Sequence, residues 1–276
     1  MTCANLMVHL EIGKSNAGLL AVAGDLAERL GAGVIGMAVC QPMLIVFDSG
    51  CYGAGDLIQQ DRDEIAAAIK LAEAEFRQAL ESRIRTLDWR SEVTLGPLSE
   101  CLACEARGAD LVLTGLGSGG SFNQTRHINI GDLVMQLGRP VLVVPPSLHE
   151  LPLERVVIGW KEAREPRRAI ADALPLLKKA GHVAVVEIAS KDDMAAADSH
   201  LKDVVGWLAR HGVAAESLPT PSTGDDASQF NAIAREHGAD LVVAGAYGHS
   251  RLREWAFGGI TRDLLFNADR CALLSH

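Results

Sequence analysis

Residues 245–265, with the sequence GAYGHSRLREWAFGGITRDLL, combine the glycines and side chains best suited to bind an anion. They follow the apolar run 241–244, and nine residues separate Gly248 from Gly258. A strand that leads through glycines to a helix start exposes backbone N–H groups, which attract phosphate. Glycine also lets the backbone approach a phosphate closely. The pattern therefore indicates a phosphate-binding loop, and an ordinary surface excursion between a strand and a helix is the alternative.

Two glycine clusters and the residues beside them would supply the contacts in such a loop. The candidates are Gly245, Gly248, Gly258, Gly259, Ile260 and Thr261, the last adding a hydroxyl donor. Arg251 is placed to screen the terminal phosphates, and His249 to contact one of them. Both are also common as solvated loop residues, and the sequence leaves that alternative open.

Signatures of catalysis are missing from the sequence. The nine histidines form no H-x-x-x-H or H-E-x-x-H pair, and no G-x-S-x-G elbow occurs. Cys101 and Cys104 form a CxxC, but they lie within an expected helix rather than at a helix start after a strand, so we expect structural cysteines. We therefore predict no catalytic residue and no metal ligand, and at most a weak ATPase activity.

Composition narrows the class of protein. The chain has 276 residues, 48% of them hydrophobic, and a net charge of −9, which argues against a nucleic-acid surface. The N-terminus lacks the features of a secretory signal, and residues 30–47 fit a strand and loop better than a membrane span. Six cysteines without a disulfide framework suit a reducing compartment. We expect a cytoplasmic protein without nucleic-acid or membrane partners.

The chain repeats itself. RGADLVLTGLGS (107–118) matches HGADLVVAGAYG (237–248), so that Asp110 and Gly115 answer Asp240 and Gly245. Residues 6–40 and 155–189 match as a second pair, and both read as strand, helix, strand. A repeat this long predicts two copies of one domain, at 1–145 and 155–276. The proline-containing segment 145–154 would link them closely.

Each copy alternates apolar runs with helical periodicity, which predicts a doubly wound α/β fold. The predicted elements of the second copy are strands at 155–159, 182–189, 214–218, 240–245 and 271–275, and helices at 166–179, 194–211, 225–237 and 259–267. Ligands of such folds lie beyond the carboxyl ends of the strands, where the strand order reverses. The glycine-rich stretch follows one of these ends.

The spacing Gly245-x-x-Gly248-x9-Gly258, followed by a small residue and Thr261, resembles the nucleotide motif of the universal stress protein family. The similarity is strong in 155–276 and weak in 1–145. It implies two five-stranded parallel sheets with helices on both faces, related to adenine-nucleotide α-hydrolases. It also implies ATP, with or without Mg²⁺, as the ligand. By position, Gly248, Gly258, Gly259 and Thr261 would contact phosphates, Ala244 and Gly245 the adenosine, and Gly159, Trp160 and Ile188 the base.

Two departures from the family pattern bear on this assignment. The family's Asp-containing turn after the first strand reads Lys161-Glu162-Ala163 here, and Gly259 stands where a hydroxyl residue is common. The first copy departs further, because no matching glycine pattern follows Gly115. We therefore expect a first domain without a nucleotide motif and a second domain with one.

Three functional hypotheses follow. The leading one is a stress-response module that binds ATP in the second domain and acts through unknown protein partners. The second is a scaffold of the same fold that binds no nucleotide, and the third is an enzyme of the wider α-hydrolase group. The two domains would form an intramolecular pseudo-dimer, and pairing of two chains into a homodimer stays open.

Overall fold

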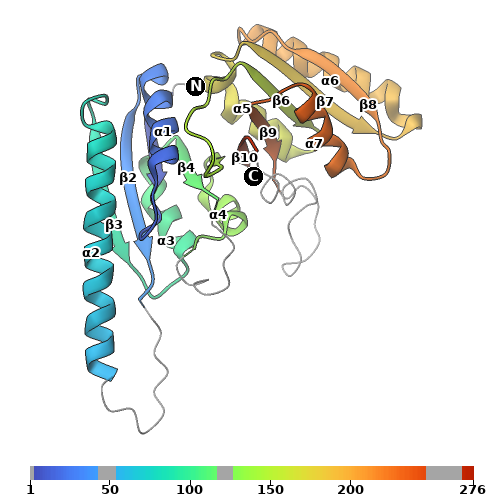
Figure 1. Cartoon of the computed structure of the whole chain (residues 1–276). Coiled ribbons are helices and arrows are strands. Elements are labelled where there is room, and N and C mark those ends of the chain that lie inside the picture. The colour runs from blue at the N-terminus through green and yellow to red at the C-terminus, as the bar shows by residue number, and fades with distance from the viewer. Residues whose placement is uncertain (1–2, 43–53, 117–126, 247–268) are drawn as a thin grey trace.

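The computed structural model of the chain describes residues 3–42, 54–116, 127–246 and 269–276 (Figure 1). Within these ranges ten strands form a single sheet with helices on both faces. The strands are β1 (Asn5–His9), β2 (Gly33–Cys40), β3 (Leu87–Val93), β4 (Leu111–Gly115), β5 (Val141–Val144), β6 (Arg155–Trp160), β7 (His182–Ala189), β8 (Glu216–Pro221), β9 (Leu241–Gly245) and β10 (Cys271–Ser275).

Helices alternate with these strands along the chain. They are α1 (Ala17–Leu30), α2 (Ala54–Leu80), α3 (Leu98–Glu105), α4 (Ile130–Leu137), α5 (Arg164–Leu177), α6 (Met194–Arg210) and α7 (Asp226–Glu236), with short 3-10 turns at Ala106–Gly108 and Lys191–Asp193. The predicted doubly wound α/β fold is confirmed. The strand predicted at 214–218 lies instead at 216–221, because β8 is a polar, proline-containing edge strand with a weak apolar pattern.

The sheet has the order β3-β2-β1-β4-β5-β10-β9-β6-β7-β8. We call β1–β5 with their helices the first half and β6–β10 with theirs the second half. Every neighbouring pair is parallel except β5 and β10, which pair antiparallel and join the halves. Figure 1 shows β10 at the centre of the molecule, where the second half meets the first. The two predicted five-stranded sheets are thus continuous.

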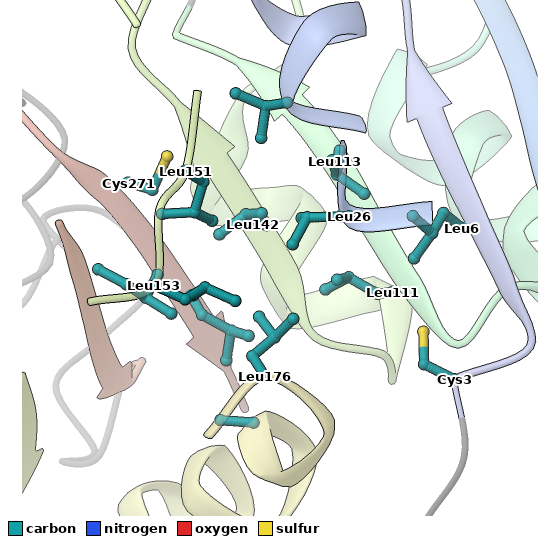
Figure 2. Packing of buried hydrophobic residues seen from close by; sticks show 14 of the residues in the cluster. Cys3, Leu6, Leu26, Leu111, Leu113, Leu142, Leu151, Leu153, Leu176 and Cys271 are labelled. Carbon is teal, nitrogen blue, oxygen red and sulfur yellow. The ribbon is translucent and has the colours of Figure 1, made fainter. Parts of the chain in front are cut away.

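The segment between the halves belongs to the core. Leu151 and Leu153 are each 1% exposed, and Figure 2 shows them among Leu142, Leu26 and Leu176, which come from β5, α1 and α5. The Arg29 guanidinium on α1 donates hydrogen bonds of 2.9 Å to the carbonyl oxygens of Leu151 and Pro152. The link therefore packs as a structural element and not as a free tether.

The repeated aspartates hold the first strand of each half. The Asp110 carboxylate accepts hydrogen bonds from the backbone N–H groups of Ala4 (2.8 Å) and Asn5 (3.0 Å), at the start of β1. The Asp240 carboxylate accepts from Glu154 (2.7 Å) and Arg155 (3.4 Å), at the start of β6. In each half, the aspartate that precedes β4 or β9 thus accepts hydrogen bonds from backbone N–H groups at the amino end of the neighbouring strand, β1 or β6. This shared role explains why the motif repeats.

Replacing Asp110 by alanine should destabilise the protein, because two backbone donors lose their acceptor. We expect the free energy of unfolding to fall by about 1–3 kcal/mol, and by less in Asp110→Asn, which retains an acceptor oxygen. Urea unfolding measures both variants beside Glu92→Ala, which removes an exposed carboxylate from β3. Equal stability of Asp110→Ala and Glu92→Ala would contradict the role given to Asp110.

Candidate functional site

The strand order of the second half reverses between β6 and β9. β6 pairs with β9 only through Val156, Val157 and Ile158. Beyond that register Gly159 and Trp160 remain paired with β7, whereas Ala244 and Gly245 remain paired with β10. The carboxyl ends of the two central strands therefore part, and a crevice in this position is the usual ligand site of open α/β sheets.

The predicted base and adenosine contacts lie on both faces of the sheet. Ala244 and Ile188 pack with the cluster that contains Phe230 of α7, and a Cβ added to Gly159 would lie 3.1 Å from the Phe230 ring. Trp160 instead packs on the opposite face, which α5 and α6 cover. The structure therefore gathers Gly159, Ile188 and Ala244 on one face and separates Trp160 from them. Gly159 has a packing reason to be glycine.

Gly245 also has a structural reason to be glycine. A Cβ at this position would lie 2.5 Å from the backbone C of Glu165 and 2.5 Å from the backbone N of Pro166, at the start of α5. A Cβ at Gly115, the matching position of the first half, would meet no atom of the described residues within 4 Å. Neither glycine has a positive φ. The two halves therefore differ in how closely a helix approaches the end of the central strand.

Alanine at these two positions should have opposite effects. Gly245→Ala forces the start of α5 to move, and we expect the free energy of unfolding to fall by about 1–3 kcal/mol. Gly115→Ala adds a methyl group that meets no atom of the described residues and restricts the unfolded chain, so stability should stay unchanged or rise by up to about 1 kcal/mol. Thermal unfolding of the matched pair measures the difference, and a loss of equal size in both variants would refute the packing argument.

The glycine loop itself lies outside the described residues. This applies to seven of the predicted contacts, which are Gly248, His249, Arg251, Gly258, Gly259, Ile260 and Thr261. Their roles stay predictions. What the structure places is the exit of β9 at Gly245 and Ala246, from which the chain enters that sequence.

A polar network that the sequence analysis did not predict surrounds this exit. His276 Nδ1 donates to the carbonyl oxygen of Ala246 (3.0 Å), and Arg164 Nη2 donates to His276 Nε2 (3.0 Å), which fits a neutral imidazole protonated at Nδ1. Arg164 also donates to the buried Glu165 carboxylate (2.8 Å). Burial would raise the pKa of Glu165, but backbone and Arg164 hydrogen bonds outweigh it and lower that pKa. The network fixes the carboxyl end of β9 against α5.

A buried glutamate lies near the ends of β6 and β7. Glu187 is 7% exposed and pairs in register with Trp160. Its Oε1 lies 3.3 Å from His200 Nδ1 on α6. The Glu187 Oε2 and Trp160 Nε1 atoms are buried, and neither has a hydrogen-bond partner in the part of the chain described. The sequence signal for this site is a charged residue inside the apolar run 183–189.

The first half contains a cavity at its own reversal point. It has a volume of about 140 Å³ and lies at the carboxyl ends of β1 and β4, with His9, Glu11, Thr114, Gly115 and His127 in its wall. His9 and Thr114 pair in register and are 6% and 2% exposed. The sequence predicted no nucleotide motif here and nominated none of these residues for binding.

A hydrogen bond joins the buried histidine to the neighbouring strand. Thr114 Oγ1 lies 3.0 Å from His9 Nδ1 and 3.4 Å from the carbonyl oxygen of Gly115. Burial lowers the pKa of His9 to about 4, with Glu11 opposing the shift and His127 adding to it. His9 is thus neutral at neutral pH.

This buried histidine should make stability depend on pH. Because the pKa of His9 is lower in the folded protein than its ordinary value of 6.5, the unfolded chain binds the proton first as pH falls. The contribution of neutral His9 to the free energy of unfolding is fully present above pH 6.5. It is lost as pH falls toward 4, and the loss amounts to about 3 kcal/mol in total.

Urea unfolding from pH 8 to pH 4.5 measures this dependence, and a His9→Asn variant should show a flatter profile than the parent. Glu11, His127 and Thr114 face the same ring, so the comparison is between the slopes of the two proteins. Parallel profiles would contradict the assignment of the neutral, buried His9.

Three further possibilities, a reactive CxxC pair, a metal site and a membrane span, find no support in the described ranges. Cys101 and Cys104 of α3 are free thiols, and burial, followed by Glu92 and Glu105, raises the pKa of Cys101, which disfavours the reactive thiolate. No cluster of three or more His, Cys, Asp or Glu side chains suited to a metal ion occurs among the residues described. None of the described helices is long and apolar enough to span a membrane.

Comparison with known proteins identifies the fold. No family model matches the sequence, and no curated protein matches it. Among solved structures, a universal stress protein from Archaeoglobus fulgidus DSM 4304 aligns over 99% of this chain and 96% of its own, at 14% identity and a TM-score of 0.77. The chain has the fold of a universal stress protein. The near-complete coverage of both chains means that both halves take part in the match.

A second structure gives the same result. A protein from Pseudomonas aeruginosa UCBPP-PA14, provisionally named a universal stress protein, covers 99% of this chain with 93% of its own, at 13% identity and a TM-score of 0.61. The resemblance noted in the sequence thus extends to the universal stress protein fold over the whole chain.

Proposed function

We propose that this protein binds an adenine nucleotide, ATP, in its second half and acts as a regulatory stress-response module in the cytoplasm. The observation that carries the proposal is the parting of β6 and β9 after Ile158 and Val243. The chain leaves β9 at this reversal point and enters the sequence Gly245-x-x-Gly248-x9-Gly258. An open reversal point followed by glycine-rich backbone is the setting in which phosphates bind to N–H groups.

The proposal divides the chain at the linker. Residues 155–276 would form the nucleotide-binding domain, and 1–145 a domain of the same fold without a nucleotide motif. Protein partners would receive the signal. Any Mg²⁺ would be held mainly by the nucleotide's phosphates, as is usual for this ion, and any hydrolysis would be slow.

One set of contacts favours the second hypothesis, in which the protein is a scaffold that binds no nucleotide. The Glu162 carboxylate, in the turn after β6, is paired with Arg167. The position of Gly245 is closed by the start of α5. A nucleoside at the reversal point would thus lack the family's Asp acceptor and would meet backbone beside Gly245. The scaffold is the second candidate, and it would act through protein contacts alone.

Calorimetric titration with ATP and Mg²⁺ tests the choice. The nucleotide-free protein should bind ATP with micromolar affinity and adenosine much more weakly, since the loop would contact phosphates. A Gly248→Val, Gly258→Val double variant should lose this binding, because β-branched side chains keep phosphate from the backbone.

A matched control separates loss of binding from loss of folding. Gly108→Val and Gly206→Val make the same chemical change where an added Cβ meets no atom of the described part of the chain within 4 Å, and this double variant should bind as the parent does. Thermal unfolding confirms that each variant is folded. No heat with millimolar ATP in the parent protein would reject nucleotide binding and leave the scaffold.

A further inference from the structure

The two edges of the ten-stranded sheet differ in the backbone groups that they present. β3 and β8 are its outermost strands in the part of the chain described (Figure 1). Directly after β8, Ser222 N donates to the carbonyl oxygen of Ala189 on β7 (2.7 Å). Because backbone direction alternates along a strand, the odd-numbered residues of β8 point outward. Two of them, Pro219 and Pro221, have no N–H, so this edge lacks donors for a further strand.

The outer edge of β3 keeps its donors. Val34 N donates to the carbonyl oxygen of Thr86 (2.9 Å), and Thr94 N donates to that of Cys40 (3.0 Å), so the even-numbered residues of this strand face β2. The odd-numbered residues from 87 to 93 therefore direct their N–H and C=O groups away from the sheet. None of them is proline. An edge of this kind is a template for pairing with another strand.

Apolar side chains follow one face of β3. Leu87 and Trp89 pack on the face that α1 and α2 cover, and the ring centroids of Trp89 and Phe76 lie 5.5 Å apart. Val93 lies on the same face by strand alternation, but it is 47% exposed. Leu95, two residues farther along, is 76% exposed. Two exposed apolar side chains thus continue a packed apolar row at an open edge of the sheet.

Charged side chains follow the opposite face of β3. Asp88, Arg90 and Glu92 alternate with the apolar row. Arg90 Nη1 donates to the carbonyl oxygen of Glu105 (3.0 Å), which places this face beside the end of α3. Arg90 Nε also pairs with Asp88 (3.1 Å), whereas Glu92 has no ion pair within the described residues. The strand therefore offers both signs of charge along its edge.

Symmetry and backbone direction limit how two β3 strands can pair. In an antiparallel pair with a two-fold axis, outward-pointing residues must meet each other, so the axis lies at a residue and not between two. An axis at Arg90 places that residue opposite its own copy and Asp88 opposite Glu92, and like charges directly opposite are destabilising. An axis at Trp89 leaves Val93 opposite a residue outside β3.

An axis at Ser91 matches both faces of the strand. Trp89 then faces Val93 of the second copy, and Arg90 faces its Glu92, and symmetry repeats each pair. Trp89, Ser91 and Val93 are odd-numbered, so the backbone groups that meet across the axis are the outward-pointing ones and can form hydrogen bonds.

We propose that this protein forms a homodimer in which the β3 strands of two copies pair antiparallel about a two-fold axis at Ser91. Leu95 would lie opposite Leu87 of the second copy and lose much of its exposure. The dissociation constant should be on the order of 100 µM, because one strand pair buries less surface than a stable interface does. The surface belongs to the first half, so the pairing is independent of the ATP binding proposed for the second.

Sedimentation equilibrium of the full chain tests the pairing. From about 10 µM to about 1 mM the protein should pass from monomer to dimer, as that affinity requires. A monomer throughout this range would overturn the proposal.

Charge exchange tests the register. Arg90→Glu and Glu92→Arg should each weaken the dimer about tenfold or more, because like charges then face each other at two places. The double variant, and an equimolar mixture of the two single variants, should regain the parent's affinity because opposite charges meet again. Arg107→Glu also removes a partner of Glu105, and Glu100→Arg changes an exposed residue of α3, so both controls should dimerise as the parent does. Unchanged affinity in Glu92→Arg would overturn the register.

A proline exchange tests the use of the β3 backbone. Ser91→Pro removes the outward N–H at the axis from both copies and should abolish the dimer while the pairing with β2 remains. Ser217→Pro makes the same change at an outward position of β8 and should dimerise as the parent does. Thermal unfolding confirms that both variants are folded. A dimer that survives Ser91→Pro would overturn pairing along this edge. None of these outcomes involves ATP, so they stand apart from those of the nucleotide titration.

Discussion

The antiparallel pairing of β5 with β10 is the interaction on which the arrangement of the chain depends. Both strands are short, apolar and buried along their whole length. Each would be an exposed edge if its half stood alone, and an exposed apolar edge invites association. Their pairing hides both edges at once, places Leu142 beside Leu273, and allows one hydrophobic cluster to run through both halves. The buried linker then closes the same cluster between α1 and α5.

Much of this fold could be predicted from the sequence. The repeat, the apolar runs and the helical periodicity fix the elements of each half, because parallel strands covered on both faces must be apolar throughout. Asp110 and Asp240 mark the repeat, and the structure adds that each one holds a neighbouring strand. The continuous sheet could not be predicted, because the apolar pattern of β5 and β10 is equally compatible with a partner in another chain.

The sites were less accessible to sequence reasoning. Glycine was taken as a sign of ligand contact, yet at Gly159 and Gly245 the neighbouring groups are Phe230 and the start of α5. Such close approaches depend on how a helix sits on the sheet, which local sequence does not encode. Conversely, the cavity beside Gly115 is formed by residues distant in sequence, and single histidines such as His9 and His127 gave no recognisable spacing.

The β5–β10 join also has a consequence for how the two halves can change. In a symmetric homodimer, any substitution appears twice, so a change that helps one site is imposed on the other. Here the same kind of two-part sheet is encoded by one chain, and each half accumulates substitutions by itself. Among the described residues, a Cβ at Gly115 would meet no atom, whereas one at Gly245 would meet the start of α5, and this difference illustrates that freedom. Covalent fusion thus allows matching positions of one sheet to acquire different surroundings.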